Sequence, residues 1–199
     1  MTIQYFLKAY HLFLRAFLCC FTALACSVSA HSLPGSELVF KNIGPKASLS
    51  LSFPLEELII AAPELDFIEH ASSLADLTNR EKSQLNQYFR HHIQLKPSNA
   101  KSQYAFLSPS LHSLVLTEAF NEHVGNYKRV EAQFSLGIET LQHDFFPLAL
   151  RYDAIMHEIR SHRVAVFFES AKNRKTKLTD FIYREVNGEP TVHVLSPAS

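Results

Sequence analysis

The sequence predicts a mainly β fold, an immunoglobulin-like β-sandwich with a helical insertion around residues 79–93. Several segments alternate apolar and polar residues with a period of two, which is typical of strands that bury one face. Asn187-Gly188 lies between two such segments and is the strongest short signal for a β-hairpin. Only one segment has firm helical signals, so strands dominate, and two packed sheets are a usual way to bury their apolar faces.

The clearest strand covers residues 47–53 (ASLSLSF), where apolar side chains take every second position and serines stand between them. The residues before it form its expected partner, joined through a turn at residues 42–45. Similar alternation, or short β-branched and aromatic runs, recur towards the C-terminus. The expected strands are residues 37–41, 47–53, 103–107, 111–117, 130–138, 148–156, 164–168, 181–186 and 190–195.

Two helices are expected between these strands. Residues 54–58 (PLEEL) predict a short one, because proline is favoured in a first turn and acids suit the positive end of the helix dipole. Thr78 and Glu81 form a capping box, in which each side chain can bond the other residue's backbone N–H. Apolar residues follow at helical spacing, which predicts a helix over residues 79–93. No change in composition marks a second domain, so residues 31–199 are expected to form one domain.

Residues 1–30 have the three parts of a secretory signal peptide. Lys8 and Arg15 supply positive charge, residues 16–26 are an apolar run, and small residues precede the expected cleavage after Ala30. A resident membrane helix needs about 20 apolar residues, which is more than this run contains. Cleavage and export to the periplasm are therefore the main interpretation.

Two alternatives for the N-terminal segment stay open: an uncleaved anchor lengthened by residues 3–14, and a lipoprotein modified at Cys26. The other two cysteines, Cys19 and Cys20, also lie within the signal. An exported domain without them would have neither disulfides nor thiolate metal ligands. Its net charge would be near −2, because removing two of the 19 basic residues leaves 17 against 19 acids. This charge gives no electrostatic reason to expect nucleic-acid binding.

Candidate metal ligands surround a predicted hairpin. Asp153 and His157 share the polar face of the expected strand at 148–156, and His162 precedes the next strand. Across such a hairpin His157 and His162 would lie opposite each other, with Cβ atoms about 4.5–5.5 Å apart. Paired imidazoles suit Zn, Cu, Ni or Fe, with Asp153 as a third ligand or as a group that orients a ring. His31 is a fourth candidate, since cleavage just before it would leave a free α-amine beside its imidazole, a nitrogen-rich arrangement that favours copper.

The alternative reading of these residues is structural. The histidine pair can simply bond the hairpin loop, and Asp153 can pair with Arg151 or Arg163. His193 is expected at the surface. The sequence contains no Gly-x-Ser-x-Gly, His-Glu-x-x-His or glycine-rich phosphate loop, so an enzyme is not expected.

Three segments resemble one family: residues 31–36 (HSLPGS), 53–58 (FPLEEL) and 150–164 (LRYDAIMHEIRSHRV). They are similar to the exported N-terminal domain of the HupE/UreJ-type membrane proteins, over most of residues 31–170. The more specific part is 150–164, where a Tyr-Asp-Ala-hydrophobic-x-His strand is followed by a second histidine and an apolar strand. The resemblance implies an accessory role at the membrane, with nickel or another transition metal as the suspected cargo.

In that family the exported domain usually precedes a bundle of transmembrane helices, whereas this chain ends at Ser199 without a second long apolar run. We therefore expect a separate inner-membrane protein as the partner. The first hypothesis is a periplasmic accessory domain that binds copper or nickel and acts with this partner. The second is a structural domain that docks on the partner through a sheet edge or the 79–93 helix without a metal. The third is an exported enzyme.

Overall fold

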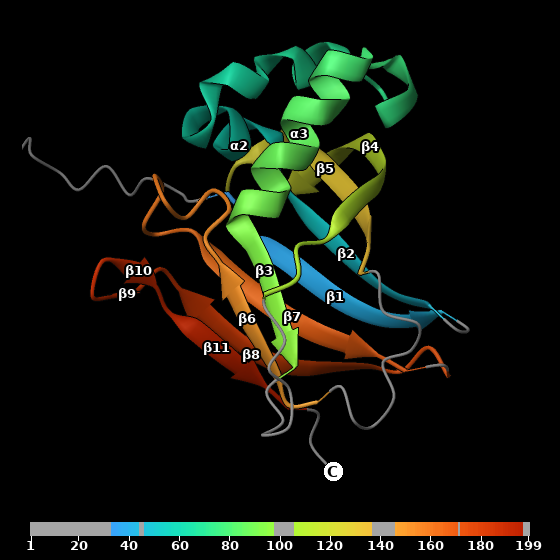
Figure 1. The fold of residues 1–199 in the computed structure, drawn as a ribbon. Helices are drawn as coiled ribbons and strands as arrows, with labels where there is room; N and C mark the ends of the chain where they lie inside the picture. Colours follow the sequence, from blue (N-terminus) through green and yellow to red (C-terminus); the bar gives the residue numbers. More distant parts are fainter. Residues whose placement is uncertain (1–32, 44–45, 98–105, 137–145, 171, 197–199) are drawn as a thin grey trace, which may run out of the picture. The chain divides into compact units, whose positions relative to one another are not determined.

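In the computed structural model a helical layer lies over one end of the strands, which form two larger sheets and a short hairpin (Figure 1). The expected signal peptide at residues 1–30 and the candidate ligand His31 lie outside the described residues. No helix in the described part of the chain is both long and apolar enough to cross a membrane. The structure describes residues 33–43, 46–97, 106–136, 146–170 and 172–196, all within the unit Ser32–Ser199.

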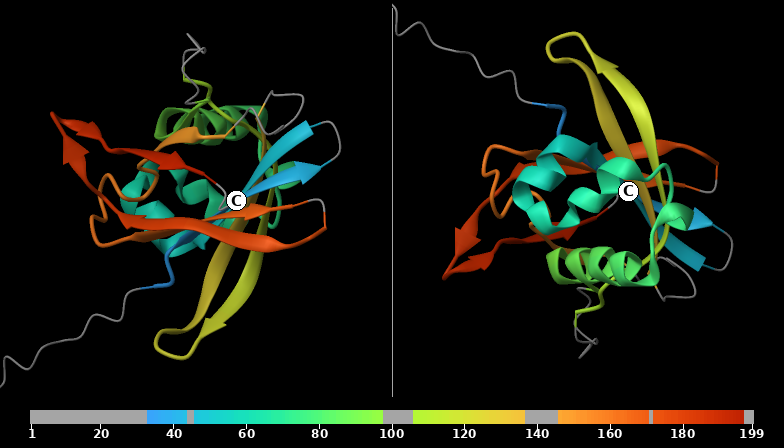
Figure 2. Two further views of the ribbon diagram at one scale, coloured as in Figure 1. Left: turned by 90° about the horizontal axis from the view of Figure 1, so that it is seen from below. Right: turned by 90° about the horizontal axis from the view of Figure 1, so that it is seen from above.

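The larger sheet has six strands in the order β4-β5-β2-β1-β7-β8. Neighbouring strands are antiparallel except β1 and β7, which run parallel. Figure 2 shows the β4–β5 hairpin extending past the rest of the sheet. The strands are β1 (Ser36–Ile43), β2 (Lys46–Pro54), β4 (Ser110–Asn121), β5 (Gly125–Ser135), β7 (Arg163–Glu169) and β8 (Lys175–Ile182).

The smaller sheet has three antiparallel strands in the order β11-β6-β3, and a short hairpin of β9 and β10 links β8 to β11. Asn187 and Gly188 at its tip have φ angles of 55° and 79°. A type I′ turn requires positive φ at both central residues, so the hairpin predicted from Asn-Gly is confirmed. The strands are β3 (Ile93–Pro97), β6 (Leu148–Tyr152), β9 (Glu185–Val186), β10 (Glu189–Pro190) and β11 (Val192–Leu195).

The mainly β prediction is confirmed, whereas the immunoglobulin-like form of the sandwich stays a prediction. The expected hairpin around residues 153–162 is wrong. The strand predicted over residues 148–156 ends at Tyr152, and β6 and β7 belong to different sheets. The segment between them is therefore a crossover from one sheet to the other.

The helical layer is larger than the expected insertion, because it begins directly after β2. The predicted capping box is confirmed: the Glu81 N–H donates to Thr78 Oγ1 at 3.3 Å, and the Thr78 N–H donates to Glu81 Oε2 at 2.7 Å. Ser73 and Asp76 form a second capping box. The helices are α2 (Leu55–Ala61), the 3-10 helices η1 (Pro63–His70) and η2 (Leu74–Asp76), and α3 (Asn79–His92).

One cluster of buried side chains joins both sheets to the helical layer. In β2 the apolar residues at alternate positions are buried and the serines between them are half-exposed, as predicted for residues 47–53. Phe89 on α3 reaches this layer, with its ring centroid 5.9 Å from Phe53 and 5.1 Å from Phe134. The shared core fixes α3 against the large sheet and thereby sets the position of the crossover segment.

Candidate functional site

The crossover at residues 153–162 is a tightly held turn. Three consecutive apolar residues in it, Ala154, Ile155 and Met156, are buried. Ile155 has a φ of 66°, a left-handed conformation that β-branched residues rarely adopt. Its N–H donates to the hydroxyl of Tyr88 on α3 at 3.0 Å, so the core holds this unfavourable conformation in place.

His162, one of the expected metal ligands, is 3% exposed and bonded through both ring nitrogens. Its Nε2 lies 3.1 Å from the backbone N–H of Ser36 and 2.7 Å from Ser36 Oγ. A backbone N–H can only donate, so Nε2 is the acceptor and the proton is on Nδ1. Nδ1 lies 2.5 Å from Glu57 Oε2 and donates to that carboxylate.

A tyrosine extends this chain of hydrogen bonds. Tyr152 Oη donates to Ser36 Oγ at 3.1 Å, and burial raises the pKa of the Tyr152 phenol. The four residues come from β6, β1, the end of the crossover and α2, and each is buried. We call Ser36, Glu57, Tyr152 and His162 the Ser36 network. It ties both sheets to the first helix.

The Ser36 network has the order of contacts found in serine hydrolases, in which serine, histidine and an acid lie in line. A nucleophilic hydroxyl must also be reachable by a substrate, and Ser36 is only 2% exposed. The chain before it is packed against β7: a Cβ on Gly35 would lie 2.1 Å from the Arg163 carbonyl oxygen. The arrangement is therefore suited to holding the fold, and Ser36 is buried in this structure.

The other predicted ligands form a second cluster at the end of α3. His157 Nδ1 lies 3.1 Å from the Asp153 carbonyl oxygen, and its Nε2 lies 3.2 Å from the Ala61 carbonyl oxygen. The Asp153 carboxylate bonds His92 Nδ1 at 2.8 Å, and the rings of His92 and His157 stack with centroids 4.4 Å apart. The geometry thus directs His157 and His162 to different partners, and the described residues contain no group of three or more His, Cys, Asp or Glu arranged to hold a metal ion.

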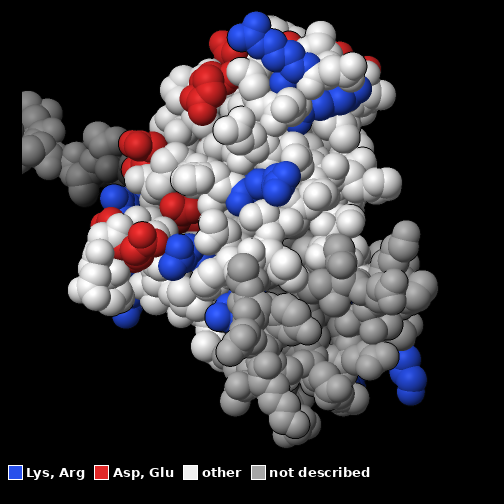
Figure 3. Space-filling model, in the orientation of Figure 1, with Lys and Arg blue, Asp and Glu red and all other residues white. Residues whose placement is uncertain are grey.

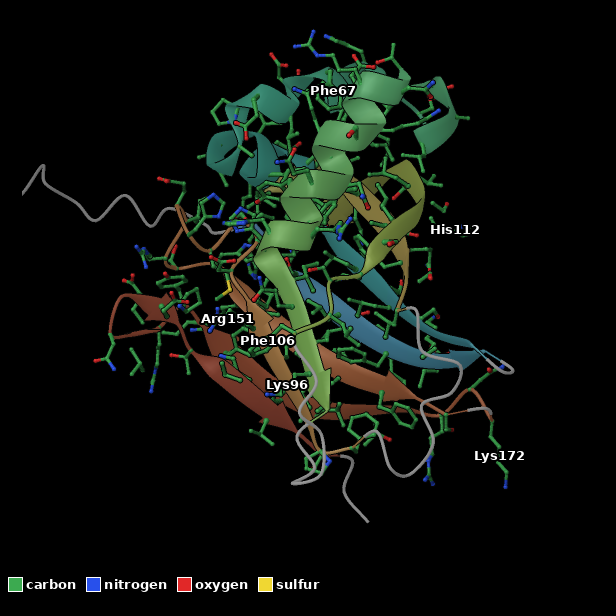
Figure 4. The ribbon with its side chains drawn as sticks, viewed as in Figure 1. Phe67, Lys96, Phe106, His112, Arg151 and Lys172 are labelled. Carbon is green, nitrogen blue, oxygen red and sulfur yellow. The ribbon has the colours of Figure 1, made fainter. Side chains whose placement is uncertain are left out.

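A different part of the molecule is open to solvent. We call residues 175–195, from β8 through the short hairpin to β11, the C-terminal arm. Arg151 on β6 pairs with Glu189 at 2.9 Å. Its guanidinium lies 5.1 Å from the centre of the Phe106 ring, and both residues are labelled in Figure 4. Arg160 pairs with Glu185 at 3.2 Å. These two ion pairs anchor the middle of the arm to the rest of the molecule.

β8 and β11 belong to different sheets, and a cleft lies between them. Thr191 and Arg184 both line it, and the Thr191 N–H donates to the Arg184 carbonyl oxygen at 2.9 Å. Phe181 and His193 also line it, and their rings stack with centroids 3.8 Å apart. The cleft has a volume of about 560 Å³, within the range of about 300–1,000 Å³ typical of small-molecule sites. It is lined by Arg163, Asp180, Phe181, Ile182, Arg184, Thr191 and His193.

The charges in this cleft are predominantly positive. Asp180 pairs with Lys177 at 3.3 Å, so its charge is already matched. Within the described part of the chain, the side chains of Arg163 and Arg184 have neither a hydrogen bond nor an ion pair. Burial lowers the pKa of His193, and the positive charge of Arg184 lowers it further.

The same arm carries much of the exposed apolar surface. Eight large hydrophobic residues are exposed in the described part of the chain, and half of them lie between residues 182 and 194. Val192 and Val194 alternate along β11 and share a face, the opposite one from buried Leu195. The four exposed hydrophobic residues of the arm are Ile182, Val186, Val192 and Val194.

On the face drawn in Figure 3, acidic and basic side chains lie in small separate groups and form no large field of one sign.

No protein-family model matches the chain, and a search of curated proteins finds no match. Sequence reasoning did not single out Ser36 or Glu57, which lie 126 and 105 residues from His162 along the chain. It also placed His193 at the surface, whereas the structure leaves it only half-exposed. A signal was available, because Ser36 and Glu57 lie in two of the three segments, residues 31–36 and 53–58, that the sequence analysis grouped with residues 150–164.

Proposed function

We propose that this chain is an extracytoplasmic accessory domain that acts with a separate inner-membrane protein and docks on it through the C-terminal arm. The observation that carries this proposal is the concentration of exposed valines on β11 and its hairpin. Isolated exposed apolar residues are normal on a protein surface, but a group of them on one element marks an interaction site. The export signal and the family resemblance support the location and the kind of partner.

The partner segment that fits best is an extended strand. β11 is at the edge of the smaller sheet, and an edge strand offers unpaired backbone N–H and C=O groups to a segment that adds to the sheet. The other sheet edges are less available. Leu107 exchanges two backbone hydrogen bonds with Leu95 at the β3 edge. The Ser72 carbonyl and the Asn86 side chain bond the β4 edge, and Lys175 and Lys177 place charge along β8. β11 itself (VHVL) has no charged residue apart from a histidine.

The metal-carrier hypothesis draws less support from the geometry. His162 would have to leave Glu57 and Ser36, and His157 would have to leave two backbone carbonyls, before either could bind an ion. Each exchange gives up hydrogen bonds between partly or fully buried groups. The proposed function therefore assigns these histidines to the fold and the recognition of a partner to the arm.

Photo-crosslinking in the exporting cell tests docking directly. A photoreactive residue at position 194 is expected to give a defined adduct with an inner-membrane protein. The same residue at Glu118, which is exposed on β4, serves as the matched control. Adding Val192→Lys to the position-194 probe should abolish the adduct, because it places a charge on the docking face. Equal crosslinking from both positions, or no membrane adduct from position 194, would contradict the proposal.

Metal titration tests the alternative. Residues 31–199 and residues 33–199 should be titrated with Cu(II), Ni(II) and Zn(II), because the shorter chain lacks the candidate N-terminal chelate at His31. We expect no sub-micromolar site in the shorter chain, and the same isotherm for its His157→Gln variant. Sub-micromolar binding that His157→Gln removes would restore the metal hypothesis.

A further inference from the structure

We propose that the cleft between β8 and β11 binds an organic anion, a carboxylate or phosphate group carried on an apolar body. This goes beyond docking of the arm, because it uses a different face of β11. Val192 and Val194 share one face, whereas Thr191 and His193, at the alternate positions, line the cleft. The two activities can therefore be separated by mutation.

The anionic group is selected by the two arginines. A guanidinium presents several N–H donors in a planar fork that matches the oxygens of a carboxylate or a phosphate. Arg163 and Arg184 both line the cleft, and neither is paired within the described residues. The neighbouring arginines of this region behave differently, since Arg151 and Arg160 are each bound to a glutamate of the arm. Both unpaired arginines therefore line the same cleft, whereas the paired ones hold the arm.

Among the described residues that line the cleft, the two arginines outnumber the one acid. Asp180 is the acid among the lining residues, and Lys177 pairs with it at 3.3 Å. Burial lowers the pKa of His193, and the positive charge of Arg184 beside it lowers that pKa further. An anion placed between the arginines would reverse that effect and supply the missing countercharge.

The apolar body is selected by the apolar residues that line the cleft. Phe181 stacks on His193, and Ile182, which also lines the cleft, is 42% exposed. Burying apolar area gains about 25 cal/mol per Å², so a ligand that covers these side chains binds more tightly than a bare inorganic ion. The volume of about 560 Å³ leaves space for a ligand larger than phosphate alone.

The test is a titration of residues 31–199 with benzoate, phenyl phosphate, inorganic phosphate and the neutral control benzamide, followed by calorimetry and by the NMR signals of His193 and Ile182. We expect benzoate or phenyl phosphate to bind and to raise the pKa of His193. Arg163→Gln and Arg184→Gln should each weaken binding by about tenfold or more, as expected for loss of a charge-assisted hydrogen bond. Arg90→Gln on α3, an exposed arginine outside the cleft, should leave binding unchanged.

The pattern of responses decides each part of the proposal. A preference between benzoate and phenyl phosphate identifies the anionic group. Inorganic phosphate binding as tightly as phenyl phosphate would overturn the apolar part. Equal binding of benzamide, no shift of the His193 and Ile182 signals with any probe, or an equal loss in the Arg90→Gln variant would overturn the proposal as a whole. Because Val192→Lys lies on the other face of β11, it should leave probe binding intact even where docking is lost.

Discussion

Two histidines, one just before a strand of the large sheet and one on a strand of the smaller sheet, show how differently one residue type is used. His162, just before β7, is 3% exposed and has protein partners on both ring nitrogens. His193 on β11 is half-buried, stacks on Phe181 and lies beside an arginine without a countercharge. A buried polar group with all its bonds made specifies the fold, whereas a partly exposed one among unmatched charges is available to a ligand.

The largest expected effect follows from breaking the closed network. His162→Ala would leave the Glu57 carboxylate and the Ser36 N–H buried without partners. We expect the free energy of unfolding to fall by about 3–5 kcal/mol, because a buried carboxylate and a buried N–H each lose a hydrogen bond and the packing of the ring is lost. Urea denaturation measures this change. His193→Ala is the matched control and should cost no more than about 1 kcal/mol; equal losses at the two positions would contradict the comparison.

The cluster at the end of α3 lies between these extremes. Asp153→Asn keeps the shape of the side chain but removes the charge that bonds His92. Because both side chains are mostly buried, 13% and 16% exposed, we expect a loss of about 1–2 kcal/mol. Asp66→Asn, at an exposed position in η1, should be close to neutral in the same denaturation experiment. A neutral Asp153→Asn would show that the stacked histidines hold the turn without the carboxylate.

The peripheral bond of the Ser36 network should contribute less. Tyr152→Phe removes the hydroxyl that donates to Ser36 Oγ, while Ser36 keeps its contact with His162. A single neutral hydrogen bond contributes about 1 kcal/mol. Tyr127→Phe, also at a buried tyrosine, provides the control. A double-mutant cycle with Ser36→Ala should show coupling between positions 36 and 152, and additivity would argue that the bond is weak.

The smallest effect concerns pH. Burial and Arg184 lower the folded-state pKa of His193 below its ordinary value of 6.5, so the unfolded chain takes up this proton first as the pH falls. His193 therefore reduces stability progressively from about pH 6.5 down to its folded pKa, and the full loss is present below that value. His193→Phe should show a smaller loss of stability between about pH 7.5 and about pH 5 than the parent chain. The control variant His112→Phe should keep the pH dependence of the parent chain. If His193→Phe also kept it, His193 would have to be fully solvated in the folded protein, which would contradict the prediction.

The sequence predicted the elements whose signals are local. Alternation in residues 47–53, the capping box at Thr78 and the Asn-Gly turn each depend on neighbours within a few positions, and each is confirmed. The crossover misled the prediction for a physical reason. Its buried Ala154 and Met156 continue the alternation of β6, and a periodic pattern does not distinguish a strand from a turn that packs into the core.

The sites depend on contacts that no local pattern contains. Ser36 meets His162 only because β1 pairs in parallel with β7, which comes more than a hundred residues later. The cleft forms because β8, before the short hairpin, and β11, after it, belong to different sheets. Arg163, Arg184 and His193 all line this cleft. His157 and His162 have different partners for the same reason, since their expected pairing assumed that β6 and β7 pair.

The parallel pair of β1 and β7 has a mechanical consequence. Tension applied between the start of β1 and the end of β7 would run along both strands and load their hydrogen bonds together in shear, from Ser36–Val164 to Lys41–Glu169. The β9–β10 hairpin, pulled apart from its open end, would instead lose its pairs one at a time. A domain held near β1 and pulled through its arm is therefore expected to yield first at the arm, while the strands locked by the Ser36 network remain in register.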